Sequence, residues 1–101
     1  MFTDQDSTPR VSRGNKLSTA NTRATSIGEL DDIYPGQEVT IVVGDANTTF
    51  VHTARGGAGE LRLSGARDWA AAATDTITFI GYDVDGRGTI IAVEKCRSDN
   101  T

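Results

Sequence analysis

Residues 76–95 read TITFIGYDVDGRGTIIAVEK, and this stretch decides the expected fold. It contains two runs rich in β-branched and aromatic residues, 76–82 and 89–95, and such residues favour strands. Residues 83–88 between them supply Asp and Gly, which tight turns require. The pattern predicts an antiparallel hairpin over residues 75–95.

Both faces of this predicted hairpin carry apolar groups. Strict alternation along each run gives one face made of Ile77, Phe79, Ile91 and Val93, and an opposite face made of Ile80, Tyr82, Ile90 and Ala92. A small antiparallel sheet usually buries one face and exposes the other to water. Burial of a second apolar face therefore requires either a second sheet or another chain. The candidate residues for contact with another chain are His52, Phe79, Ile80, Tyr82, Ile90 and Ala92.

A second strand pair is predicted upstream of this hairpin. Residues 39–43 (VTIVV) form a β-branched run, and residues 48–53 (TTFVHT) form another. Residues 44–47 (GDAN) lie between them and have turn chemistry. We therefore expect a hairpin over residues 38–54.

The region between the two predicted hairpins holds one more strand pattern and one helix candidate. Residues 60–64 (ELRLS) alternate in polarity, as a half-buried strand does. Residues 68–73 (DWAAAA) fit a single helical turn capped by Asp68, and are too few for a longer helix. The predicted class is all-β: a small antiparallel β-sandwich or barrel-like body of five to six short strands.

The first 21 residues differ from the rest, because their apolar residues are isolated and show no periodicity. We expect a flexible or extended N-terminal arm over residues 1–21, a β-domain over residues 22–97 and a frayed C-terminus over residues 98–101. Composition favours disorder in the arm. The alternative is an arm that becomes ordered on an acidic partner or on a neighbouring subunit. The candidate docking residues are Phe2, Arg10, Val11, Arg13, Lys16 and Leu17.

Composition excludes several classes of protein. The chain has 101 residues, a net charge of −4 and a pI near 4.7, which fit one domain and argue against a nucleic-acid partner. It has no apolar run long enough to span a membrane. One cysteine and one histidine exclude a disulfide framework and a zinc site built on cysteines. We expect no enzyme activity, no cofactor and no metal site.

Three features resemble active-site chemistry but have simpler interpretations. Residues 83–88 (DVDGRG) lack the ligand spacing of a calcium loop and fit a turn better. His52 is interpreted as a hydrogen-bonded histidine at a packed or inter-subunit surface, with a metal ligand shared between symmetry-related copies as the less favoured alternative. Cys96 is interpreted as a reduced thiol near the C-terminus.

Several segments, taken in order, resemble a small β-structured domain of tailed-phage virion proteins, namely tail fibres, tailspikes and head fibres. The match extends over about residues 22–95. The similar segments are 21–27 (NTRATSI), 36–41 (GQEVTI), 44–49 (GDANTT) followed by His52, 61–65 (LRLSG) followed by Asp68 and Trp69, 75–79 (DTITF), and Tyr82 with the turn after it. The chain departs from the pattern at residues 90–94 (IIAVE), where the family often has Trp-Tyr-Glu-Val, and at Trp69, where it tends to have Phe.

The resemblance implies a non-enzymatic virion structural protein, commonly trimeric. A chain of this size fits a capsid decoration (cement) protein or a short head fibre. It would be made in the host cytoplasm, form a homotrimer on the capsid surface, and bind the major capsid protein or another virion protein. The alternative is an adhesin of the tail-fibre or tailspike type, or a carbohydrate-binding β-module. Such a module requires exposed aromatic rings, for which the candidates are Tyr34, Trp69 and Tyr82.

Overall fold

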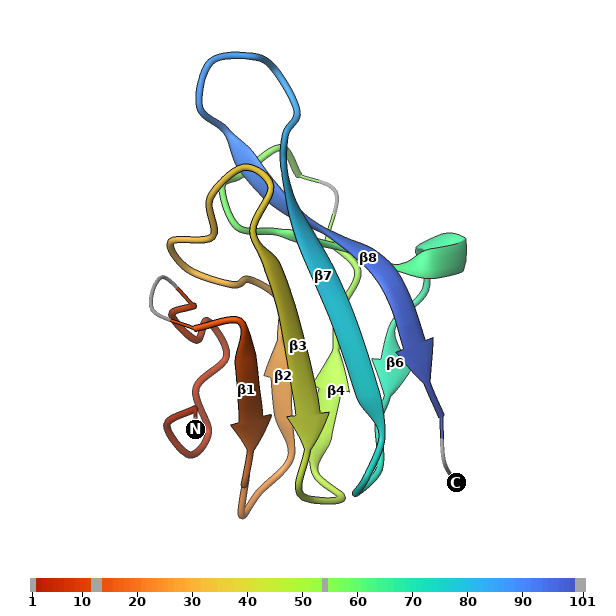
Figure 1. Ribbon diagram of the computed structural model, residues 1–101. Coiled ribbons are helices and arrows are strands. Elements are labelled where there is room, and N and C mark those ends of the chain that lie inside the picture. The colour runs from red at the N-terminus through yellow and green to blue at the C-terminus, as the bar shows by residue number, and fades with distance from the viewer. Residues whose placement is uncertain (1, 12–13, 54, 100–101) are drawn as a thin grey trace.

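Two facing β-sheets make up the computed structural model, which describes residues 2–11, 14–53 and 55–99 (Figure 1). The first sheet has five strands in the order β1 (Lys16–Thr19), β3 (Glu38–Val43), β7 (Thr76–Asp83), β8 (Ile90–Ser98) and β5 (Leu61–Arg62). The second sheet has three strands in the order β2 (Thr25–Ile27), β4 (Thr48–Phe50) and β6 (Trp69–Ala70). One 3-10 turn, η1 (Ser64–Ala66), lies between β5 and β6.

The all-β prediction is confirmed, but the sheets are mixed rather than purely antiparallel. The pairs β1–β3, β2–β4 and β5–β8 are parallel, whereas β3–β7, β4–β6 and β7–β8 are antiparallel. The described residues form eight strands instead of five or six, in two open sheets with no closed barrel. Parallel pairs arise because the chain changes sheet after every strand from β1 to β6, so neighbours in one sheet are separated by a crossover.

The predicted hairpin at residues 75–95 is confirmed, whereas the one at residues 38–54 is wrong. Strands β7 and β8 pair antiparallel, with a register shift between Thr78 and Phe79. Strands β3 and β4 belong to different sheets, and residues 44–47 carry the chain from one sheet to the other. Asp45 stabilises this crossing. Its carboxylate accepts hydrogen bonds from Thr19 and Asn21, at the end of β1 and after it, and from Asn47 and Thr48, just before β4 and at its start.

The predicted helical turn at residues 68–73 is also wrong. Trp69 and Ala70 form strand β6, in which Trp69 pairs with Phe50 of β4. The two rings stack with their centroids 5.8 Å apart, and Trp69 is only 8% exposed. Burial of a large aromatic side chain outweighs the weak helix propensity of a short alanine run.

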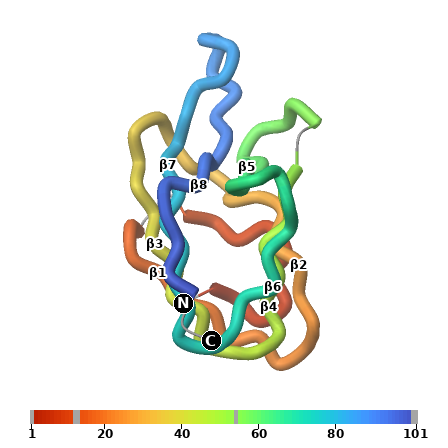
Figure 2. Tube along the Cα trace, turned by 90° about the vertical axis from the view of Figure 1, so that its right-hand side faces the viewer, coloured from red at the N-terminus to blue at the C-terminus, as the bar shows by residue number. Residues whose placement is uncertain are grey.

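The core lies between the two sheets, which Figure 2 shows facing each other. Phe50 from the small sheet is fully buried and contacts both Trp69 and Phe79, the latter with ring centroids 6.1 Å apart. The remaining core residues come from both sheets and from the loops; examples are Ile27, Leu30, Val39, Ile41, Val43, Leu61 and Ile77.

The expectation of a separate N-terminal arm is wrong for the described part of residues 1–21. Phe2 and Val11 are buried in the core, and Leu17 in β1 packs against it. The backbone N–H of Phe2 donates to Ser18 O, and that of Val11 donates to Asp31 O. The body therefore includes this segment as well as residues 22–97. The expected boundary at residue 98 also moves, because Ser98 still pairs with Thr76 in the sheet; residues 100 and 101 lie outside the described residues.

This packing predicts that Val11 contributes to stability rather than to docking. Val11 is 1% exposed, so Val11→Ala removes buried methyl groups and should lower the free energy of unfolding by about 2 kcal/mol. Urea denaturation followed by circular dichroism measures this change. Lys16→Ala, at an exposed position on β1, is the control and should change stability by less than about 0.5 kcal/mol. Equal stability of the two variants would contradict the observed packing.

Candidate functional site

The outer face of the five-stranded sheet is the side turned away from the smaller sheet. In β3, Val39, Ile41 and Val43 are buried, so the alternate residues of this strand point outward. The register of β3 with β7 places Glu38 beside Ile80 and Thr40 beside Thr78. The two threonine hydroxyls lie 2.9 Å apart and share a hydrogen bond. This face is therefore built by the alternation of three adjacent strands, β3, β7 and β8.

Three neighbouring apolar side chains on this face form what we call the outer patch: Ile80, Tyr82 and Val93. Tyr82 is 57% exposed, while Ile80 and Val93 are half-buried cross-strand partners. Val42 is 39% exposed on the same face, but it pairs with Thr76 and is separated from the patch by Thr40 and Thr78. Close to Ile80, Glu38 forms an ion pair with Lys95, with Oε1 and Nζ 2.8 Å apart. The hydrogen bond to Glu38 raises the pKa of Lys95. The outer patch is thus an apolar strip beside a charged pair.

The structure does not bring the predicted contact residues together. Phe79 and Ala92 have no exposed surface and belong to the core, so their assignment to an interface is wrong. Ile90 is half-buried and packs against the core. Only Ile80 and Tyr82 lie in the outer patch. His52 follows β4 of the smaller sheet.

The error comes from the register of the hairpin. Strict alternation groups Ile80 and Tyr82 with Ile90 and Ala92, but their cross-strand partners are Val93 and Ile91. Val93 and Ile91 were therefore both assigned to the wrong face. Val42 was missed altogether, although the alternation of the VTIVV run places it on the face opposite to Val39, Ile41 and Val43.

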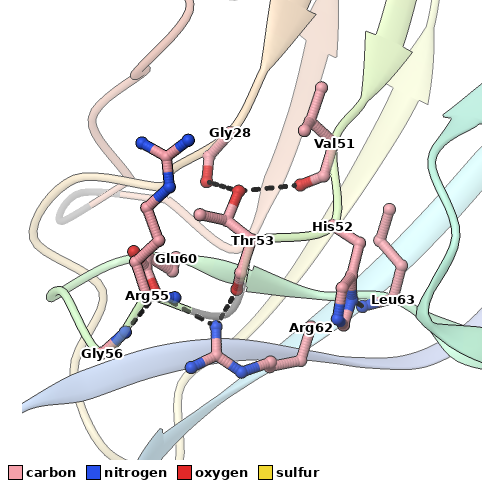
Figure 3. Close-up of polar contacts among 9 residues, drawn as sticks. All are labelled: Gly28, Val51, His52, Thr53, Arg55, Gly56, Glu60, Arg62 and Leu63. Atoms are coloured by element: carbon pink, nitrogen blue, oxygen red, sulfur yellow. Dashed lines mark hydrogen bonds and ion pairs between the residues drawn. The ribbon is translucent and has the colours of Figure 1, made fainter.

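A second cluster of polar groups surrounds residues 52–63, where the chain passes from β4 to β5 (Figure 3). His52 is half-buried, and its Nδ1 accepts a hydrogen bond from the backbone N–H of Leu63 at 2.9 Å. This agrees with the interpretation of a hydrogen-bonded histidine. Among the described residues, no group of three or more His, Cys, Asp or Glu side chains is placed to hold a metal ion.

Glu60 is the buried carboxylate of this cluster, at 3% exposure. Its Oε1 accepts hydrogen bonds from the backbone N–H groups of Arg55 and Gly56, both at 3.0 Å, and lies 3.2 Å from Arg62 Nη1. Burial raises the pKa of Glu60. The hydrogen bonds from Arg62 and from the backbone lower the pKa by more than burial raises it, so the pKa lies below its usual value. Arg62 also donates to Thr53 O. All these contacts close the loop onto the sheet.

Two of the basic residues expected to dock on a partner, Arg10 and Lys16, lie at the surface in different settings. Arg10 has 70% of its side chain exposed and forms an ion pair with Asp32, with Nε and Oδ2 2.6 Å apart. Lys16 is exposed on β1. Arg13 lies outside the described residues. Arg10 and Lys16 are therefore exposed at the surface, while Phe2 and Val11 are buried.

The acidic loop between β7 and β8 uses its carboxylates to close its own turn. Asp83 accepts the backbone N–H groups of Gly86 and Gly88, and Asp85 accepts that of Arg87 together with the hydroxyl of Thr89. The bond from the Arg87 N–H lowers the pKa of Asp85. This geometry fits the interpretation of a turn.

The aromatic residues considered for sugar binding divide between surface and core. Tyr34 is 53% exposed and Tyr82 is 57% exposed. Trp69 is buried, with one face of its ring stacked on Phe50 and the guanidinium of Arg97 lying 4.4 Å from its centroid. Trp69 is therefore not an open stacking surface.

The described residues form no helix that is long and apolar enough to cross a membrane. Comparison of the chain with known proteins found no matching family model, no matching curated protein and no matching solved structure.

Proposed function

We propose that this chain is a non-enzymatic structural protein of a tailed-phage particle, of the capsid decoration (cement) or short head-fibre type, that assembles as a homotrimer. The resemblance of residues 22–95 to a β-domain of virion proteins supports the class of protein. The outer patch supports assembly, and it is the observation that carries the proposal. A sheet face that meets water is usually polar, whereas this face carries an exposed tyrosine, Tyr82, beside half-buried Ile80 and Val93.

The proposed contact between subunits places the outer patch at the centre and the Glu38–Lys95 ion pair at the rim. Apolar and aromatic groups contribute most to affinity at the centre of an interface, and charged groups at the rim contribute more to orientation and rate. The proposed second partner is the major capsid protein or another virion protein. Exposed Arg10 and Lys16 provide positive groups for an acidic surface on that partner.

The oligomeric state tests the proposed assembly. We expect a trimer at micromolar concentration by sedimentation velocity and native mass spectrometry. Ile80→Lys places an ammonium group in the outer patch and should raise the dissociation constant at least about 100-fold, which corresponds to about 3 kcal/mol. Ala70→Lys adds the same charge at an exposed position of the smaller sheet and should leave the trimer intact. A stable wild-type monomer, or equal dissociation of the two variants, would contradict the proposed contact.

The virion assignment is tested separately. Mass spectrometry of purified particles should detect the chain in a copy number that is a multiple of three. Added protein should also bind particles that lack it. A wild-type trimer that is absent from purified particles and does not bind them would leave the assembly in place and refute the virion role.

The second candidate is a carbohydrate-binding module or adhesin, and one observation favours it: Tyr34 and Tyr82 are both more than half exposed. Because Trp69 is buried, its fluorescence is a poor reporter of a ligand at these tyrosines. Chemical-shift changes of the tyrosine ring signals during titration with oligosaccharides are the appropriate measurement. Saturable shifts would favour the adhesin over the decoration protein.

A further inference from the structure

The segment that follows β5 is tied to the rest of the body through ionisable side chains. We call residues 63–68, which include η1, the β5–β6 link. The backbone N–H of Leu63 donates to His52 Nδ1 at 2.9 Å, and that of Ser64 donates to Glu94 Oε1 at 2.8 Å. In the opposite direction, the backbone N–H of His52 donates to Asp68 Oδ1 at 2.9 Å. Each of these bonds has an acceptor that can be protonated.

The bond from Leu63 determines the protonation state of His52. A nitrogen that accepts a hydrogen bond carries no proton, so the imidazole is neutral and its hydrogen is on Nε2. A protonated imidazole carries hydrogens on both nitrogens and accepts no hydrogen bond. Protonation of His52 and the His52–Leu63 bond are therefore mutually exclusive. Figure 3 shows the imidazole beside Leu63, at the edge of the cluster around Glu60.

The charges around His52 are largely paired with one another. On β5, Arg62 contacts Glu60, and on β8, Arg97 forms two hydrogen bonds to Glu94, at 2.7 and 2.8 Å. The other charged groups near this segment are exposed: Arg55 on the loop before β5, and Arg67 and Asp68 on the link itself. The partly buried charges on β5 and β8 therefore occur as opposite pairs.

Two of these acceptors differ in kind, since His52 offers an imidazole nitrogen and Glu94 a carboxylate oxygen. Histidine is the side chain that ordinarily gains its proton between about pH 8 and pH 5. Carboxylates are protonated at lower pH, and the hydrogen bonds from Arg97 lower the pKa of Glu94, which keeps the Ser64 bond in place. Protonation of the imidazole therefore removes the acceptor of the Leu63 bond, while the carboxylate that accepts the Ser64 bond remains.

We propose that His52 is an acid-sensitive latch that fixes the β5–β6 link at neutral pH and releases its first residue when protonated. Leu63 is 5% exposed and belongs to the core cluster, so its release loosens the edge of the core next to η1. This property is independent of the proposed virion function. It requires only His52, the backbone of Leu63 and a change of pH.

Hydrogen exchange of the Leu63 amide tests the latch. The protection factor, corrected for the intrinsic pH dependence of exchange, should fall at least about tenfold between pH 7.5 and pH 5.5. The fall should have the same midpoint as the ring signals of His52, which is the one histidine of the chain. The amide of Val51 donates to Ile27 O, a group that does not titrate, and serves as the internal control. A Leu63 amide with pH-independent protection overturns the proposal.

Two substitutions separate the latch from general acid sensitivity. His52→Asn offers an amide oxygen in place of Nδ1 and should keep Leu63 protected at both pH values. His52→Ala offers no acceptor and should leave Leu63 unprotected at both. Loss of protection in acid that persists in His52→Asn would assign the effect to another group and refute the latch. If His52→Ala fails to fold, the comparison of wild type with His52→Asn still decides.

Discussion

Replacing Gly81 by alanine should lower the free energy of unfolding by at least about 3 kcal/mol. A Cβ at this position would overlap the carbonyl oxygen of Tyr34 and lie 2.9 Å from its carbonyl carbon. Both atoms are backbone, so no side-chain rotation relieves the clash. For a domain of this size the change corresponds to a fall in melting temperature of at least about 12 °C.

The backbone around Gly81 is also poorly able to move. Gly36 N donates to Gly81 O and Gly81 N donates to Gln37 O, both at 2.9 Å. The side chain of Gln37 is in turn bonded to Val11 O and Gly14 O. Displacing the loop would therefore break bonds that hold the N-terminal segment.

Gly28→Ala is the matched control for Gly81→Ala. A Cβ at position 28 would meet its nearest atom, Thr53 Oγ1, at 3.6 Å, which is an ordinary contact. This variant should differ from wild type by less than about 1 kcal/mol. Urea unfolding of the three proteins provides the measurement. Equal loss of stability in both variants would mean that the loop at Tyr34 does not approach β7 as described.

The second large effect is expected for Asp45→Ala, which should cost about 3 kcal/mol of stability. The Asp45 carboxylate accepts hydrogen bonds from the Thr19 hydroxyl at 2.7 Å, the Asn21 N–H at 2.9 Å, and the Asn47 N–H and Thr48 hydroxyl at 2.8 Å. Thr19, Asn21 and Thr48 are buried, so the variant leaves polar groups without a partner in the interior. Thermal unfolding at pH 7 measures the loss.

The stabilisation from Asp45 should depend on pH. Burial raises the pKa of this carboxyl. The hydrogen bonds from Asn21, Thr19, Asn47 and Thr48 together lower the pKa by more than burial raises it, so the pKa in the folded protein lies below the usual value. A lowered folded pKa means that the contribution is complete above about pH 4, the ordinary pKa of an aspartate, and is lost as the pH falls through the folded value.

The difference in stability between wild type and Asp45→Ala should therefore shrink below pH 4. Asp85→Ala, in the exposed loop between β7 and β8, removes a carboxylate that bonds only within its own turn, and is the control. Its effect at pH 7 should be much smaller. A difference for Asp45→Ala that stays constant down to pH 2 would contradict the role assigned to the ionised carboxylate.

The parts of the fold that the sequence predicts are those set by local pattern. The hairpin of β7 and β8 was predicted from two contiguous strand patterns and the turn between them. The same kind of pattern over residues 38–54 predicted a hairpin wrongly, because β3 and β4 belong to different sheets and a local pattern does not specify the sheet. The parallel pairing of β1 with β3 was not predicted, because it joins segments more than twenty residues apart and leaves no local signal. Val11 illustrates the same limit: an isolated valine in a polar stretch gives no periodicity, yet loop contacts bury it.

The candidate site was predicted in part for a related reason. The exposure of Tyr82 and the partial exposure of Ile80 follow from alternation along one strand. Which residues of β8 lie beside them depends on the cross-strand register, which is set by the length of the turn between Asp83 and Ile90. Sequence alternation alone therefore placed Ala92 at an interface, although Ala92 is in the core.

The change of sheet after every strand from β1 to β6 has a consequence for synthesis of the chain. Strand β7 is the central strand of the larger sheet and lies between β3 and β8. The β1–β3 pair therefore cannot join the rest of this sheet before the ribosome has passed residue 83, where β7 ends. Until then β3 has an unpaired edge, and its apolar residues Val39, Ile41 and Val43 lack a strand neighbour on that side. Nascent or prematurely terminated chains that end before β7 therefore expose a strand edge that can pair with another chain, a known route to aggregation.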